Sequence, residues 1–428
     1  MASASLSTRD PLLIEQLLAP AFYILQNSIR GVREEGALPD TDLVRCGVMR
    51  TLSQSRSGRD LLQHLSEVHK IEVARSTYFG AHHSKRRRDI LSQLNTQLVA
   101  HHRADLPDLL AGFPQLKNRS VFAVDGQHIG HGVHAAVDEE QRYVSVNTLY
   151  LTCLHSGLLF NLGAVQGDGE HHHEMPVFRV RITDWLLKHR NRRSPPPIFV
   201  VDTGFVDNTF WTRMRLAAAQ GALFITRTKE NMTPEVCGNP PWDRGARINQ
   251  GVTADELVGF DNACVMRRVQ YVDPESGTAY EFLTTILDLP PGLIALLFLL
   301  RWRIEKIFDT AKNKLEETKA WANGALAQDT QAHVLALTHN LLVLIRDKLA
   351  REHGIQELKV VQKRETALER RHEMAASCGR VVAHFQEKLP PIVQLTVQFI
   401  RTLRNGILGK LRWLAAVAHL RTSMEKYL

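Results

Sequence analysis

The chain has few cysteines, and they do not fall in the spacings that metal sites and disulfide frameworks use. There are five among 428 residues, namely Cys46, Cys153, Cys237, Cys264 and Cys378. They are widely scattered, odd in number and never spaced as CxxC, which argues against a zinc ribbon and against a disulfide-stapled scaffold. We therefore expect a reducing, cytoplasmic location.

Long apolar segments are also absent. The N-terminal stretch MASASLSTRDPLLIEQLL has no basic region followed by an apolar core and a cleavage site, so we expect no secretory signal. The apolar run GLIALLFLL at 292–300 is shorter than the roughly 20 residues that cross a bilayer, and charged residues follow it at once. We expect a buried helix there and no membrane partner.

Internal repeats and low-complexity tracts do not occur. Hydrophobic residues make up 44% of the chain and charged residues 23%, which are the proportions of a globular protein. The net charge of +8 favours polyanionic partners such as DNA, because cations that contact phosphate release condensed counterions. On charge alone, a basic enzyme that does not act on nucleic acid is an alternative.

The first 115 residues read mostly as helices. Helices at 57–71 and 74–91 are joined by a short turn, and the second carries the basic run from Lys85 to Arg88. The pair favours a helix-turn-helix whose DNA-facing residues would be Arg75, Thr77, Tyr78, His82, Lys85 and Arg86. A solvated basic helix without DNA contact is an equally good interpretation.

From residue 119 the hydrophobic pattern becomes typical of short strands. The predicted order is strands at 120–126, 142–154 and 157–166, a helix at 174–190, a strand at 198–205, a helix at 208–220, a strand at 222–228 and a last helix at 292–320. This is the order of an α/β, ribonuclease-H-like mixed sheet core. The segment before the last helix is rich in Pro, Gly and short alternating runs, which predicts a β-rich insertion, and helical N- and C-terminal regions flank the core.

Two aspartates follow apolar runs in this core. Asp125 closes VFAV and Asp202 closes IFVV, so each would stand at the end of a buried strand. Ligands of open α/β sheets gather at such strand ends. An aspartate that starts a turn or caps the next helix is the ordinary alternative for each one.

The predicted last helix carries a row of charged residues. Phe298, Arg301, Glu305 and Lys312 would lie within an arc of roughly 60° at about 100° per residue. An apolar stripe centred roughly 90° away would pack the helix, so the row would lie along its edge. A solvated ion pair between Arg301 and Glu305 is the simpler alternative, but it does not account for Trp302 beside the row or for the two aspartates upstream.

Together these residues resemble a DDE transposase of the insertion-sequence class, in which the last acidic residue lies in a Tyr-Arg-Glu-Lys signature. Phe298, Arg301, Glu305 and Lys312 keep every spacing of that signature, with Phe in place of Tyr. The words VDGQ around Asp125, VDTGFVD at 201–207 and GALFITRTKEN at 221–231 also resemble the family. The resemblance covers residues 119 to about 345.

The resemblance implies a site in which Asp125, Asp202 and Glu305 bind two Mg²⁺ or Mn²⁺ ions. Such ions take oxygen ligands, and two of them about 3.5 to 4 Å apart stabilise the attacking and leaving oxygens of a phosphoryl displacement. It also implies that Arg301 and Lys312 hold the DNA backbone near the transposon end. We expect Trp302 and Phe298 beside that DNA, although Phe298 lacks the hydroxyl of Tyr and can only stack or pack.

We therefore predict a helical N-terminal DNA-binding region at 1–115, the first part of the catalytic core at 116–230, the β-rich insertion at 231–289, the last part of the core with its acidic helix at 290–345, and a basic helical C-terminal region at 346–428. The expected function is cut-and-paste transposition at the bacterial nucleoid. Its partners would be double-stranded DNA, as terminal inverted repeats and target, and a second copy of the chain in a homodimeric synaptic complex.

Two alternatives stay open, a DNA-binding protein that has lost catalysis and a structure-selective nuclease. A cluster of His and acidic residues at 168–174 could bind a transition metal, but an exposed loop before a helix is the commoner reason for such a run.

Overall fold

The computed structural model of the chain describes residues 11–52, 58–69, 71–129, 146–166, 174–189, 194–217, 221–229, 232–260, 264–274, 276–301, 320–322 and 324–352. Trp302, Glu305 and Lys312 lie outside these residues, as do residues 168–173 and the chain after residue 352. No helix of the described part is long and apolar enough to cross a membrane.

The N-terminal part is helical, as predicted, and consists of α1 (Pro11–Ser28), α2 (Asp40–Leu52), α3 (Gly58–His69), α4 (Arg75–Ala81) and α5 (Lys85–His102). The single helix predicted at 74–91 is wrong, because the chain breaks between α4 and α5. Ser84 has an extended backbone there, with φ −87° and ψ 111°, and its hydroxyl accepts a hydrogen bond from the Arg87 amide. A serine in this position caps a new helix and ends the one before it.

The centre of the molecule is one mixed sheet with the strand order β3-β2-β1-β4-β5-β9-β8-β7-β6. The first five strands are β1 (Val121–Ile129), β2 (Val146–Cys153), β3 (Leu159–Gln166), β4 (Ile198–Val200) and β5 (Leu223–Arg227). β1, β2 and β3 pair antiparallel, whereas β4 pairs parallel to β1 and β5 pairs parallel to β4. The predicted ribonuclease-H-like order is confirmed.

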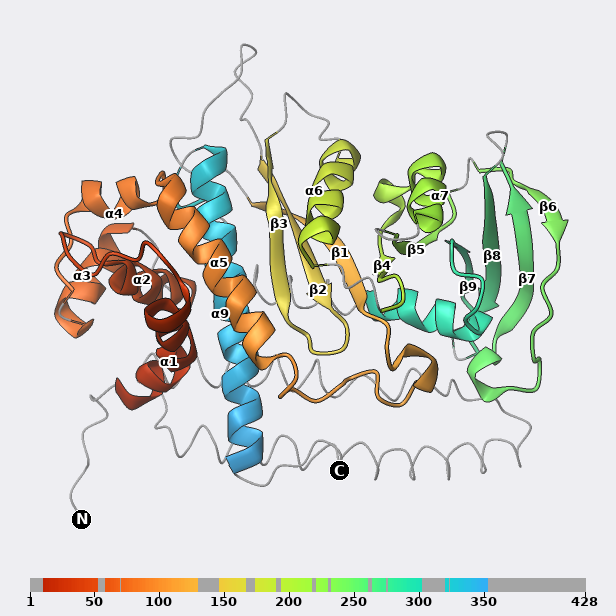
Figure 1. Cartoon of the computed structure of the whole chain (residues 1–428), viewed down its shortest axis with the longest axis horizontal. Helices are drawn as coiled ribbons and strands as arrows, with labels where there is room; N and C mark the ends of the chain where they lie inside the picture. The colour runs from red at the N-terminus through yellow and green to blue at the C-terminus, as the bar shows by residue number, and fades with distance from the viewer. Residues whose placement is uncertain are drawn as a thin grey trace, which may run out of the picture.

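The predicted insertion adds strands to the same sheet. These are β6 (Glu235–Gly238), β7 (Val252–Gly259), β8 (Val265–Val272) and β9 (Ala279–Thr284). β9 pairs antiparallel with β5, and β8, β7 and β6 follow outward, so the insertion continues the sheet at the right of Figure 1.

Helices cover both faces of the sheet. On one face α6 (Glu174–His189) and α7 (Asn208–Leu216) pack on side chains that include Phe122, Val124, Phe199 and Val201. The opposite face buries the alternate residues of the same strands, among them Ala123 and Val200, beneath the helix that begins at residue 291 and beneath the N-terminal helices. This alternation is what a strand with both faces buried requires.

The long helix α9 (Ala325–Glu352) joins the N-terminal helices to the sheet, since it lies between α5 and the edge strand β3 (Figure 1). The side-chain amide of Asn340 in α9 hydrogen-bonds to the backbone of Leu159 in β3, as the backbone of a neighbouring strand would. Its amide oxygen accepts from the Leu159 amide at 2.7 Å, and its amide nitrogen donates to the Leu159 carbonyl at 2.8 Å. The N-terminal helices, α9 and this face of the sheet therefore share one core.

Candidate active site

Asp125 lies midway along β1, and Asp202 lies two residues past the end of β4, the parallel neighbour of β1. The predicted strand end at Asp125 is wrong, because β1 continues to Ile129 in its pairing with β2. β1 and β4 pair as Phe122 with Phe199 and Ala123 with Val200, and each aspartate lies two residues beyond the last of these pairs. Asp202 keeps an extended backbone, with φ −77° and ψ 168°. Because side chains alternate along a strand, both carboxylates project on the face of Ala123 and Val200, where the helix from residue 291 packs.

Arg301 of that helix reaches both carboxylates. Its Nη1 lies 3.8 Å from Asp125 Oδ2, and its Nη2 lies 3.6 Å from Asp202 Oδ1. The Arg301 side chain is 3% exposed, against 22% for Asp125 and 49% for Asp202. A buried guanidinium thus spans the gap between two carboxylates that remain open to solvent, and it offsets their mutual repulsion.

The ordinary explanation of Asp202, as a helix cap, does not hold. Asp202 precedes the short 3-10 helix at Thr203–Phe205, but its side chain makes no capping hydrogen bond. Asp207 does perform that role for α7, since its Oδ1 accepts from the Phe210 amide at 2.9 Å and its carboxylate pairs with Arg179. Two aspartates in the same short segment therefore have different roles, and only Asp202 faces the edge shared with Asp125.

The place of Phe298 beside DNA stays a prediction, and in this structure the ring is buried. Phe298 is 2% exposed and packs against Phe282 of β9, with ring centroids 5.1 Å apart. The Arg301 guanidinium lies over the same ring, at 5.2 Å from its centroid. A phenylalanine at this position could stack on DNA or pack inside the protein, and in this structure Phe298 packs inside the protein.

DNA contact by Arg301 stays a prediction. In this structure its side chain is 3% exposed and faces the two carboxylates.

The carboxylate pair suits a hard divalent cation. Asp125 and Asp202 offer oxygen donors from two rigid strands, and oxygen is the ligand that Mg²⁺ and Mn²⁺ take in proteins. No cluster of three or more His, Cys, Asp or Glu that could hold a metal occurs within the described residues. The third acid predicted for the site, Glu305, lies outside them.

The basic run at the start of α5 binds acids of the protein itself. Arg86 Nη1 and Nη2 lie 2.6 and 2.9 Å from the carboxylate oxygens of Asp40 in α2, and Arg87 Nε lies 3.2 Å from Asp40 Oδ1. Arg88 Nη1 lies 3.2 Å from Asp329 Oδ2 in α9. Since cations at a helix N-terminus oppose the helix dipole, these acids offset an unfavourable placement and fasten α5 to α2 and α9.

The pKa of Asp40 shows that Arg86 and Arg87 stabilise its charged form. Burial alone would raise the pKa of its carboxyl, but the hydrogen bonds from Arg86 and the Arg33 amide, with the charges of Arg86 and Arg87, hold that pKa below its ordinary value. Sequence reasoning missed Asp40 and Asp329 because nothing in their local sequence pairs them with a run that is 46 to 241 residues away.

Two of the predicted groove contacts, Tyr78 in α4 and His82 just after it, are buried within the protein. Tyr78 is 0% exposed and His82 is 1% exposed, so neither side chain can reach a DNA groove. Arg75 and Lys85 are exposed, and DNA contact by them stays a prediction. Arg86 is only partly exposed and already holds Asp40.

A ribonuclease-H-like sheet with one carboxylate on β1 and a second just after its parallel neighbour β4 defines a class of α/β proteins with an acidic site on the sheet. Within that class, the family model for the transposase DDE domain matches residues 116–341, more than half of the 428 residues, and the chain belongs to this family. A comparison with curated proteins found no match.

Proposed function

We propose that this protein is a DNA transposase that cleaves DNA at transposon ends and transfers the cleaved strands into target DNA. Asp125, Asp202 and Glu305 would be its metal ligands and catalytic acids. The observation that carries the proposal is the pair of carboxylates, Asp125 on β1 and Asp202 just after β4, that both lie within 4 Å of Arg301. Family membership supports the reaction class.

Each residue of the site has a distinct part in this proposal. Two divalent ions, when bound, would stabilise the negative charge that develops on the attacking and leaving oxygens. Asp125 and Asp202 would hold them from adjacent strands, and the half-exposed Asp202 leaves the edge accessible to a DNA phosphate. Arg301 is a positioning residue that fixes the spacing of the two aspartates.

The position of Arg301 supports Glu305 as the third acid. Residues 291–301 are helical and Arg301 faces the aspartates. If the helix continues as its sequence predicts, Glu305 follows about 6 Å along the axis and roughly 40° around it, which turns its carboxylate toward the same edge. A solvated surface pair between Arg301 and Glu305 is disfavoured because Arg301 is buried.

The same proposal assigns the partners. Double-stranded DNA with terminal inverted repeats, then target DNA, would be the substrates, with Arg75, Lys85 and Lys312 as phosphate contacts, and Trp302 is retained as a DNA neighbour. Two ends must be cut and joined together, which favours a homodimer in the synaptic complex. We infer action on cytoplasmic DNA at the nucleoid, on the evidence of the scattered free cysteines and the basic net charge.

The test is cleavage and joining of DNA that carries the element's ends, in the presence of Mg²⁺ or Mn²⁺. Asp125→Asn, Asp202→Asn and Glu305→Gln should each lower cleavage by roughly a thousandfold or more, because residues that act as one unit fail together. Binding of the end DNA in EDTA should persist. Asp207→Asn is the matched control, since asparagine also caps helices and the residue faces Arg179.

Two results would contradict the proposal. Full cleavage by Glu305→Gln would remove the third acid from the site. Cleavage by the unaltered protein without joining to target DNA would instead support a structure-selective nuclease.

A further inference from the structure

One pocket lies away from Asp125 and Asp202. It is lined by Ser120 and Phe122 at the start of β1, by Cys153 at the end of β2 and by Ser194 just before β4. β2 runs antiparallel to β1, with Phe122 paired to Cys153, so these residues mark the N-terminal end of β1. Asp125 lies three residues beyond Phe122, or roughly 10 Å at about 3.3 Å per residue, and the Phe122 side chain points to the opposite face of the sheet. The pocket is therefore separate from the candidate active site.

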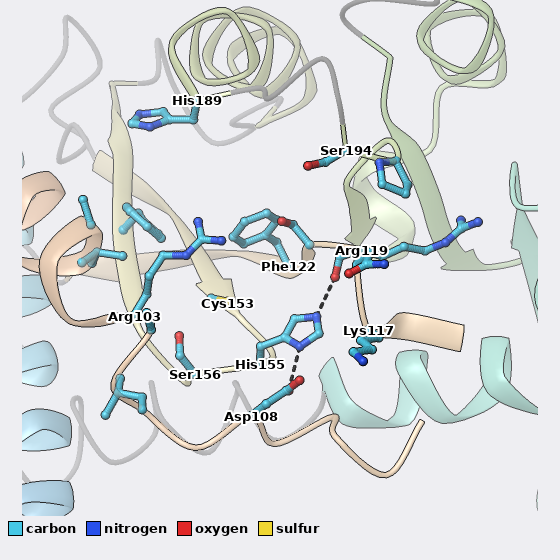
Figure 2. Close-up of a pocket in the computed structure, with 18 of the residues that line it drawn as sticks. Arg103, Asp108, Lys117, Arg119, Phe122, Cys153, His155, Ser156, His189 and Ser194 are labelled. Atoms are coloured by element: carbon cyan, nitrogen blue, oxygen red, sulfur yellow. Dashed lines mark hydrogen bonds and ion pairs between the residues drawn. The ribbon is translucent and has the colours of Figure 1, made fainter. Parts of the chain in front are cut away.

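The pocket has the size of a ligand site. Its volume is about 820 Å³, within the roughly 300 to 1,000 Å³ typical of small-molecule sites. The wall formed by residues 103–120 is held in place by His155, whose Nδ1 lies 2.7 Å from Asp108 Oδ1 and whose Nε2 lies 2.7 Å from the Arg119 carbonyl (Figure 2). These two contacts join a loop to the end of β2, so the pocket is a built feature of the fold.

Positive charge dominates the pocket wall. Asp108 is the one acidic residue that lines it, and it is paired with His155. Arg119 is paired with Asp288. Arg103 and Lys117 are exposed, and neither makes an ion pair within the described part of the chain. They lie on either side of Phe122 in Figure 2, so two uncommitted cations flank the cavity.

Aromatic rings line another part of the pocket. Trp185 and His189 lie one turn apart on α6, with ring centroids 5.0 Å apart and planes inclined by 31°. Phe122 and Phe160 lie against the same indole, at 4.9 and 6.4 Å. His189, at the end of this ring group, is exposed.

We propose that this pocket binds one unpaired nucleotide of a DNA strand, with its base against the His189 and Trp185 rings and its phosphate between Arg103 and Lys117. Cations that follow the backbone together with rings that stack on bases are the combination by which proteins hold single-stranded nucleic acid. A base inside a duplex cannot stack on a protein ring, so the strand must be unpaired at this point. The inference rests on the proposed function, because it takes DNA to be the substrate.

The test uses the full-length protein in EDTA, which separates binding from catalysis. Binding of a fluorescein-labelled 12-nucleotide single strand is measured between 50 and 300 mM salt. Arg103→Gln with Lys117→Gln should lower the magnitude of the log–log salt slope by about 0.7, the contribution of the one phosphate that the two cations hold on a single strand. His189→Ala should weaken binding roughly fivefold or more and leave the slope unchanged, because stacking carries no counterion release.

A matched control shows whether the salt dependence comes from the pocket or from the positive charge of the protein as a whole. Lys229→Gln with Arg244→Gln removes the same charge from exposed positions elsewhere and should keep the original slope. An equal fall in the magnitude of the salt slope in that control variant, or an unchanged slope in the pocket variant, overturns the proposal. An equal effect of the pocket substitutions on binding of the duplex form, or loss of the labelled strand to polyglutamate at equal charge concentration, overturns it as well.

Two further arms identify the source of the nucleotide and keep the hypotheses apart. A deoxynucleoside monophosphate should compete only at far higher concentration than the strand, and equal competition would assign the pocket to a free nucleotide. A protein that binds the strand through this pocket but does not cleave with Mg²⁺ refutes the proposed transposase activity alone. One that cleaves while the pocket variants bind normally refutes the pocket alone.

Discussion

Asp125 and Asp202 occupy equivalent positions on two neighbouring parallel strands, each two residues past the last pair of the β1–β4 ladder. They are distant in sequence, and the ladder brings them to one edge, where Arg301 lies within 4 Å of both carboxylates. The first prediction follows from that shared contact.

Arg301 holds the spacing of the two acids. Arg301→Lys keeps the charge but has one nitrogen where the guanidinium offers a two-pronged group, and Arg301→Gln loses the charge as well. Because a displacement of about 1 Å can cost roughly a hundredfold in rate, we expect cleavage to fall by roughly tenfold in the lysine variant and roughly a hundredfold in the glutamine variant. The Mn²⁺ concentration for half-maximal cleavage should change in both. An unchanged Mn²⁺ dependence with equal activity losses would show a merely structural role.

Gln127 lies two residues beyond Asp125 on the same face of β1 and is 0% exposed. Neither its Oε1 nor its Nε2 has a hydrogen-bond partner within the described part of the chain. A buried amide without partners costs stability, so Gln127→Met should raise the free energy of unfolding by about 1 kcal/mol. If the buried Gln127 amide serves the catalytic site, Gln127→Met should also lower cleavage, because residues that serve such a site often reduce stability. Urea unfolding and the cleavage assay measure the two effects, and a destabilised variant would contradict this reading.

Asp40 fastens α2 to α5. Asp40→Asn leaves Arg86 and Arg87 without their buried counter-charge, and breaking such a pair costs roughly 3 to 5 kcal/mol. Since Arg86 is about 30% exposed, we expect the lower end of that range. Asp42→Asn, two residues further on the same helix, is the control and should change the free energy of unfolding by less than about 0.5 kcal/mol. Equal losses in both variants would mean that the carboxylate of Asp40 has no special part.

Three buried histidines make stability depend on pH. Burial lowers the pKa of His82 to about 3 and the pKa values of His333 and His339 to about 4, against about 6.5 in the unfolded chain. The unfolded state then binds more protons than the folded state as pH falls below about 6.5. The stability they contribute is fully present above about pH 6.5 and is lost as the pH falls toward about 4.

The urea midpoint should therefore drop between pH 7.5 and pH 5. His339→Gln keeps a donor for the Gly157 carbonyl, which His339 Nε2 contacts at 2.9 Å, and should reduce the drop. His83→Gln, at an exposed position, retains the three buried rings and should keep the full drop. A midpoint that is constant over this range would contradict the prediction.

The sequence by itself determined the order of the core strands and helices, because apolar runs before Asp125 and Asp202 are local patterns typical of buried strands. It also indicated the transposase DDE family that the family model shows. What individual residues face depends on partners far away in the chain. Only the tertiary structure placed Arg301 between two acids, buried Phe298 and Tyr78, and paired the Arg86 run with Asp40 and Asp329. The pocket between Arg103 and Lys117 also depends on the tertiary structure. It forms where the ends of β1, β2 and α6 come together, and no local sequence pattern predicts that contact.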